Sequence, residues 1–93
     1  MSAEPEVQAS EQLVWTARSY ARDIVAGTVS PFEGSRRIWR ECQLRLAKGD
    51  HRLDPFVYWA SEYEEATDEA RRALCNKGMR QAAMDLLGTG SAL

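Results

Sequence analysis

The residues best suited to chemistry are a single histidine, His51, and two cysteines, Cys42 and Cys75. A cysteine nucleophile needs a base held beside it, yet His51 follows a polar stretch while both cysteines have apolar neighbours at helical spacing. We therefore expect His51 to be a solvated loop residue and the cysteines to be buried thiols, which behave as small hydrophobes. No Cys-x-x-Cys spacing suggests redox or metal chemistry, so we predict a protein that is not an enzyme.

Carboxylates offer a second kind of chemistry. Glu62 and Glu65 are three residues apart and share one helix face, but both point away from the aromatic side of that helix. A dinuclear metal centre in a helical bundle needs inward glutamates with Glu-x-x-His pairs, and the sequence contains no such pair. We predict neither a metal nor a cofactor.

Charge is segregated along the chain. Residues 36–52 hold six basic and two acidic residues, a net of +4, whereas residues 54–69 hold six acidic residues and no basic one. One explanation is that two antiparallel helices exchange ion pairs, each contributing about 0–1 kcal/mol. The other is that the acidic end faces outward and docks a basic partner, for example a nuclease whose phosphate-binding site it occupies. Such fields speed and orient encounters more than they raise affinity.

Three apolar residues fall on the wrong side of their helices. At about 100° per residue, Tyr58 points away from Phe56 and falls among the glutamates, and tyrosine is a common interface anchor. Trp15 lies opposite Ile24, and Leu44 is also off its apolar face. Either ring could instead cover a neighbouring helix. The predicted partner surface comprises Tyr58, Glu62, Glu64, Glu65 and Glu69, with Trp15 as a second surface, and its partner is another protein or a second copy of this chain.

Nucleic-acid binding is the alternative function. Arg36, Arg37 and Arg40 with Gln43 form a basic, polar helix face, and the Gly27–Ser30 turn loosely fits a helix-turn-helix. The acidic segment that follows would repel phosphate, which favours a protein partner.

Four helical segments must position these residues, and strand patterns are nearly absent. We expect the first helix to run from near Ser10 to a glycine cap at Gly27. Ser30-Pro31 begins the second, where Glu33 can reach back to the Ser30 amide, and Gly49 ends it. The third and fourth helices are bounded by the same kinds of capping residue. Asp54-Pro55 begins the third, Thr67 or Asp68 caps the fourth, and Gly88 ends it, whereas residues 1–9 and 89–93 are expected to fray.

Apolar residues recur at three and four within each segment, which gives every helix one buried face. The expected faces are Leu13, Ala17, Tyr20, Ala21 and Ile24; Phe32, Ser35, Ile38, Trp39, Cys42 and Leu46; Phe56, Trp59, Ala60 and Tyr63; and Leu74, Cys75, Met79, Ala82, Ala83, Leu86 and Leu87. Gly34 and Gly78 lie inside helices, where each costs about 1 kcal/mol relative to alanine. We expect them to make room for Trp39 or Trp59.

The segments Gly27–Trp39 (GTVSPFEGSRRIW) and Leu53–Glu62 (LDPFVYWASE) carry a resemblance. They resemble a group of small uncharacterised bacterial all-helical proteins that pair a serine-capped, glycine-containing helix start with an aromatic helix ending in acidic residues. The resemblance spans about residues 17–87 and implies an all-helical bacterial protein without naming an activity. Some proteins of this size serve as immunity partners of toxins.

Composition limits the function classes, the cellular location and the number of domains. The chain has 93 residues, 44% of them hydrophobic, and a net charge of −2, which lacks the strong basic excess typical of nucleic-acid-binding domains. Its longest apolar run, residues 56–60, is far below the roughly 20 residues that span a bilayer. The polar N-terminus does not resemble a secretory signal, so we expect a cytoplasmic protein without membrane contact. We predict one all-α domain over residues 1–93, a compact antiparallel bundle of three to four helices.

Overall fold

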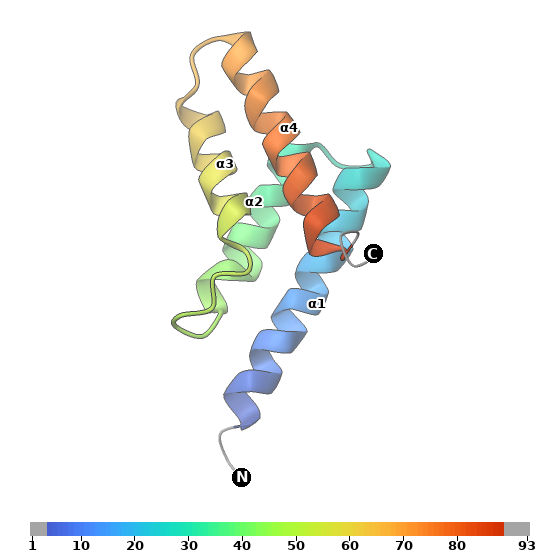
Figure 1. The fold of residues 1–93 in the computed structure, drawn as a ribbon, viewed down its shortest axis with the longest axis vertical. Coiled ribbons are helices and arrows are strands. Elements are labelled where there is room, and N and C mark those ends of the chain that lie inside the picture. Colours follow the sequence, from blue (N-terminus) through green and yellow to red (C-terminus); the bar gives the residue numbers. More distant parts are fainter. Residues whose placement is uncertain (1–3, 89–93) are drawn as a thin grey trace.

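The computed structural model describes residues 4–88, which form four α-helices and one short 3₁₀ turn. These are α1 (Glu4–Ala26), α2 (Pro31–Glu41), the 3₁₀ turn η1 (Gln43–Arg45), α3 (Asp54–Glu65) and α4 (Glu69–Leu86). Each helix packs against the next, and α4 returns to pack against α1 and α2 (Figure 1). The predicted all-α bundle is confirmed.

The first helix is longer than predicted. It begins at Glu4 rather than near Ser10, so its N-terminal half projects beyond the other helices (Figure 1). Pro5 is tolerated in the first turn because its missing N–H would be unpaired there anyway. Of the ends expected to fray, residues 1–3 and 89–93 lie outside the described residues.

Glycine ends α1 as predicted. Gly27 has a φ of 83°, and the amide of Thr28 donates to the carbonyl of Asp23 at 3.0 Å while the Gly27 amide donates to Ile24 at 3.2 Å. This pair of bonds satisfies the last carbonyls of the helix. The chain then turns sharply toward α2.

The start of α2 is confirmed in part. Ser30 is the N-cap, and its hydroxyl accepts a hydrogen bond from the Glu33 amide at 3.1 Å. The Glu33 carboxylate does not reach back to Ser30 as predicted. It accepts a hydrogen bond from Arg37 Nε at 3.2 Å, because an arginine one turn later offers a charged donor.

The end of α2 comes earlier than predicted. The α-helix stops at Glu41, Cys42 leaves helical geometry, and η1 replaces the final turn. This change redirects the chain so that Leu46 packs against the core, and Gly49 occupies the following loop with a φ of 89°.

The caps of the last two helices follow different rules. Buried Leu53 is the N-cap of α3, so the prediction that Asp54 caps it is wrong. The Asp54 carboxylate is engaged elsewhere, accepting from Gln43 Nε2 at 3.1 Å and pairing with His51 Nδ1 at 2.8 Å. Asp68 caps α4 as expected, accepting from the Arg71 amide at 2.8 Å.

The core consists of two clusters. The larger joins α1, α2, the start of α3 and the end of α4, and contains Ala17, Ala21, Ile24, Ile38, Cys42, Leu53, Phe56, Ala82 and Ala83. The smaller comprises Ala60, Cys75 and Met79, against which Phe32, Trp39, Trp59 and Tyr63 pack. The rings of Phe32 and Tyr63 stack 4.5 Å apart and so bring α2 and α3 together. Leu74 is the one wrong member of the predicted faces, because its side chain is 48% exposed.

Both helical glycines allow close approach, as predicted, but with one different partner. A Cβ at Gly78 would overlap the indole of Trp59. At Gly34 the neighbours are Ile24 and Val29 rather than Trp39, because this turn of α2 faces the end of α1.

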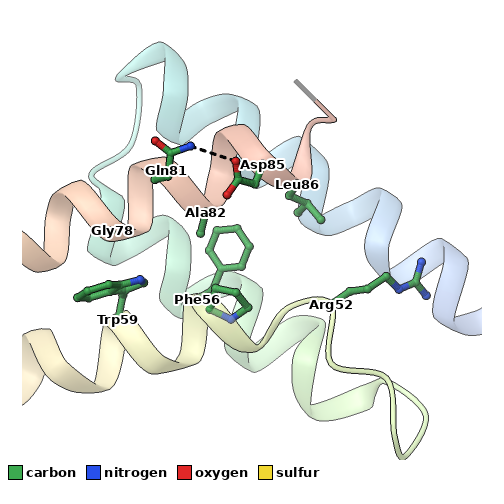
Figure 2. Close-up of a pocket in the computed structure, with 9 residues that line it drawn as sticks. Arg52, Phe56, Trp59, Gly78, Gln81, Ala82, Asp85 and Leu86 are labelled. Carbon is green, nitrogen blue, oxygen red and sulfur yellow. Dashed lines mark hydrogen bonds between the residues drawn. The ribbon is translucent and has the colours of Figure 1, made fainter. Parts of the chain in front are cut away.

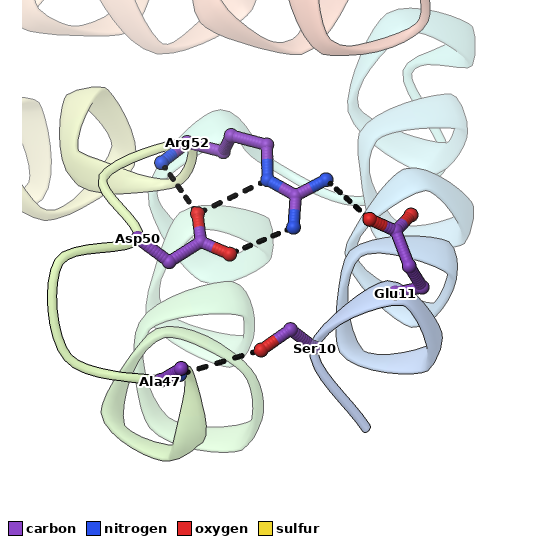
Figure 3. Close-up of polar contacts among 5 residues, drawn as sticks. All are labelled: Ser10, Glu11, Ala47, Asp50 and Arg52. Atoms are coloured by element: carbon purple, nitrogen blue, oxygen red, sulfur yellow. Dashed lines mark hydrogen bonds and ion pairs between the residues drawn. The ribbon is translucent and has the colours of Figure 1, made fainter. Parts of the chain in front are cut away.

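One loop arginine fastens the projecting helix to the bundle. Arg52 donates from Nη2 and Nε to the Asp50 carboxylate, at 2.7 and 3.0 Å, and from Nη1 to Glu11 at 3.1 Å (Figure 3). The guanidinium holds the pKa of Asp50 below its usual value of 3.8. Beside it, the Ala47 amide donates to the hydroxyl of Ser10. The loop between α2 and α3 is therefore tied to α1 by polar contacts.

Candidate functional site

Tyr58 points away from the apolar face of α3, as its helical position predicted, and it is 54% exposed, which excludes the alternative that a neighbouring helix covers it. The ring rests edge-on against the half-buried indole of Trp59, with ring centres 4.9 Å apart. Contact with an anchored ring limits the motion of Tyr58, so less conformational entropy is lost when a partner covers it.

The indole of Trp59 forms the wall of an open groove between α3 and α4. The groove has a volume of about 470 Å³. Its lining residues are Arg52, Pro55, Phe56, Trp59, Gly78, Gln81, Ala82, Asp85 and Leu86. Figure 2 shows the indole lying beside Gly78 and the ring of Phe56 near Ala82, while the Gln81 amide donates to Asp85 at 3.0 Å. The apolar floor thus has a polar rim on the α4 side.

Glu62 follows Tyr58 by one turn of α3 and is paired across the hairpin. Its carboxylate accepts a hydrogen bond from Arg71 Nη2 at 2.6 Å. This hydrogen bond raises the pKa of the Arg71 guanidinium, because the carboxylate stabilises its charged form. Leu74 lies on α4 between Arg71, which meets Glu62, and Gly78, which meets Trp59. We call the set Tyr58, Glu62, Glu65, Arg71 and Leu74 the acidic–aromatic surface.

The other glutamates near the turn between α3 and α4 have no such cationic partner within the described part of the chain. Glu64, Glu65 and Glu69 are exposed, and none of them forms an ion pair with another residue of the described range 4–88. Glu65 and Glu62 line a shallow depression of about 230 Å³ where α3 turns into α4. The acidic residues therefore meet solvent at this end of the hairpin.

The predicted exchange of ion pairs between the basic and acidic segments is not found among the described residues, apart from one contact. His51 pairs with Asp54 at 2.8 Å, but no arginine or lysine of residues 36–52 pairs with a carboxylate of residues 54–69. The basic residues that do pair use other partners: Arg37 uses Glu33 within its own helix. Ion pairing between the two segments therefore does not account for their opposite charges.

The predicted site residues do not form one surface. Tyr58, Glu62 and Glu65 lie together, and Glu69 follows in the first turn of α4. Glu64 lies on the other side of α3 and faces α2, where it lines a different pocket.

Trp15 stands apart from these residues, on α1. It is 64% exposed, with the Arg18 guanidinium 5.9 Å from its ring centre. Because α1 packs against α2 and α4, Trp15 forms a separate exposed feature.

The candidate nucleophiles and base are not brought together. Both cysteines are buried free thiols, as predicted, and burial raises the pKa of Cys42 to about 11. The His51 side chain is 74% exposed and bonded to Asp54. Within residues 4–88 no cluster of three or more histidine, cysteine, aspartate or glutamate side chains could hold a metal ion.

Sequence reasoning missed the α4 half of the surface. No sequence pattern marks Arg71, and helical spacing places Leu74 on the buried face. Gly78 did predict a close contact with a tryptophan, Trp39 or Trp59. It gave no indication that the contact with Trp59 would form one wall of a groove.

No helix within the described residues is both long and apolar enough to cross a lipid bilayer. No protein family, curated protein or solved structure matches this chain.

Proposed function

We propose that this chain is a non-enzymatic protein-interaction module that docks a basic protein through its acidic–aromatic surface. The observation that carries the proposal is the half-exposed ring of Tyr58, which is held against Trp59. It shares its side of the helix with Glu62, which Arg71 binds, and with exposed Glu65, which forms no ion pair among the described residues. A toxin-neutralising or regulatory role is the specific form we propose, in which the acidic residues occupy a cationic site on the partner.

The composition of the surface supports this assignment. A single exposed hydrophobic side chain is common on protein surfaces and needs no explanation. Here two large ones, Tyr58 and Leu74, are exposed on helices that pack together, which is more typical of an interaction site. Tyrosine and arginine are over-represented among residues that dominate binding energy, and Arg71 is oriented by its bond to Glu62. Surrounding carboxylates steer a basic partner toward this centre.

The nucleic-acid alternative has weaker support. Of its four residues, Arg37 is bound to Glu33, and Gln43 donates to Asp54. Arg36 lies over the ring of Phe32, 5.6 Å from its centre. Only Arg40 is both exposed and without such a contact, too few for the multiple phosphate contacts that dominate DNA affinity.

A binding comparison tests the proposal. Wild-type protein and the Tyr58→Ala/Glu65→Lys variant are immobilised at equal density, and proteins captured from a lysate of the source cells are identified and quantified. We expect one or more basic proteins to be recovered on wild type and reduced at least about tenfold on the variant, a loss of about 1.4 kcal/mol.

Asp23→Lys is the matched control, since it makes the same charge change at an exposed position on α1. It should recover the same proteins as wild type. Equal recovery on wild type and on the Tyr58→Ala/Glu65→Lys variant would refute the assigned surface. Binding of a labelled DNA duplex by wild type, lost in Arg36→Ala/Arg40→Ala, would favour the alternative.

A further inference from the structure

A second pocket lies on the opposite side of α3, where α2 and η1 meet it. It has a volume of about 270 Å³ and is lined by Arg36, Trp39, Arg40, Leu44 and Glu64, which we call the basic pocket. Four of these residues come from α2 and η1, and Glu64 comes from α3.

The two guanidiniums of the basic pocket lack carboxylate partners among the side chains that the structure describes, although that of Arg36 lies over the ring of Phe32. Arg36 and Arg40 are one helical turn apart, and neither forms an ion pair or a side-chain hydrogen bond with any residue of the range 9–88, whose side chains the structure describes. Glu64 shares the pocket but is not bonded to either guanidinium. Two cations and one carboxylate leave an excess of one positive charge. Arg37, on the same helix, is different because Glu33 already binds it.

An apolar platform adjoins these cations. Leu44 is 69% exposed, the highest value among the exposed large hydrophobic side chains of the described residues. The 3₁₀ turn holds it at the rim of the pocket. Trp39 lies half-buried beside it and is supported from below by the smaller core cluster. A ligand that covers both side chains would remove apolar surface from water at a site already ordered by the fold.

We propose that the basic pocket binds an acidic peptide segment of a partner protein, one that presents an apolar side chain between or beside its carboxylates. The carboxylates meet Arg36 and Arg40, for which guanidinium geometry is well suited, and the apolar side chain covers Trp39 and Leu44. This site goes beyond the proposed function, because its charge is opposite to that of the acidic–aromatic surface and its lining includes no residue of that surface.

Charge and size favour a peptide over a nucleic acid. The pocket offers two guanidiniums without a carboxylate partner among the described side chains, and Glu64 with the neighbouring acidic end of α3 opposes a continuous polyanion. Base stacking would also need an accessible aromatic face, whereas Trp39 is half-buried and the exposed group is the aliphatic Leu44. A short segment can place one or two carboxylates while leaving Glu64 uncovered.

Fluorescence anisotropy with a labelled peptide, Asp-Asp-Phe-Leu-Asp-Asp, tests the proposal at low ionic strength. Wild type should bind it, and an Asn-Asn-Phe-Leu-Asn-Asn peptide should bind at least about tenfold more weakly because the charge-assisted hydrogen bonds are lost. Arg36→Ala/Arg40→Ala should weaken binding of the acidic peptide by about tenfold or more. Leu44→Ser should weaken it without a change in protein charge, and Glu64→Gln should strengthen it by removing a like charge.

Arg80→Ala is the matched control, since Arg80 is exposed on α4 and outside the pocket, and it should bind the peptide as wild type does. Circular dichroism verifies that each variant is folded. Equal peptide affinity for wild type, Arg36→Ala/Arg40→Ala and Glu64→Gln would overturn the proposal, as would no binding up to millimolar peptide.

Two further outcomes would also overturn it. Sedimentation showing a dimer of wild type that Arg36→Ala/Arg40→Ala abolishes would make a second copy the occupant. A labelled DNA that binds the pocket in preference to the peptide would assign the site to nucleic acid. The dimer result leaves the acidic–aromatic surface untouched, because the test of that surface changes Tyr58 and Glu65. The DNA result would in addition favour the nucleic-acid alternative to the proposed function.

Discussion

Replacing Gly78 with alanine tests the contact that joins α3 to α4. In an unpacked helix interior alanine is more favourable than glycine by about 0.8–1 kcal/mol. Here the new Cβ would stand 2.7 Å from Trp59 Nε1 and closer still to two carbons of the indole. The ring is rigid, so relief requires the whole side chain to move away from α4. Overpacking of this kind costs about 1–3 kcal/mol, which outweighs the gain in propensity.

We therefore expect Gly78→Ala to lower the free energy of unfolding by about 1 kcal/mol, the difference between these opposing effects. For a domain of this size that corresponds to a fall in Tm of about 4–8 °C. Urea denaturation and thermal melts followed by circular dichroism measure both quantities.

A second background separates the two effects. In a Trp59→Ala chain the obstruction is gone, so Gly78→Ala should stabilise by about 0.8–1 kcal/mol through propensity alone. The sign of the effect thus reverses between backgrounds, a coupling of about 2 kcal/mol, within the range seen for contacting residues. A rise in Tm on introducing Gly78→Ala into the wild-type chain would refute the close approach of Trp59.

The remaining predictions concern a cap, an acid-sensitive contact and the thiols. Ser30→Ala should lower the free energy of unfolding by about 1 kcal/mol in urea titrations, because the Glu33 amide loses its acceptor. Arg52 lowers the pKa of Asp50 in the folded state, so its stabilising effect is present above the usual pKa of 3.8 and is lost as pH falls through the folded value. Unfolding experiments from pH 6 to pH 2 should show a smaller acid-induced loss for Arg52→Ala than for wild type. Cys42 and Cys75 should react with a thiol reagent at pH 8 only at the rate of opening, and a labelling rate equal to that of the urea-unfolded chain would contradict their burial.

The sequence predicted the helices where local chemistry was sufficient. Ser30 and Asp68 cap helices because their side-chain oxygens reach an amide three residues on, and Gly27 ends α1 because it tolerates a positive φ. Helical angle also placed Tyr58 and Trp15 off the apolar faces of their helices, although it did not decide whether a neighbouring helix would cover either ring. In each case the determining interactions lie within one or two turns of the residue.

Tertiary packing decided the rest, because it depends on which helices meet and at what register. Asp54 was expected to cap α3, but Gln43 and His51 compete for its carboxylate from the preceding loop. Leu74 belongs to an apolar pattern yet remains exposed, since α3 covers only part of that face of α4. The sequence by itself determined four amphipathic helices and two oppositely charged segments. Only the tertiary structure decided that, among the described residues, those segments form no ion pair with each other except that of His51 with Asp54. The physical reason is that whether a carboxylate meets a guanidinium depends on the rotation of each helix about its own axis.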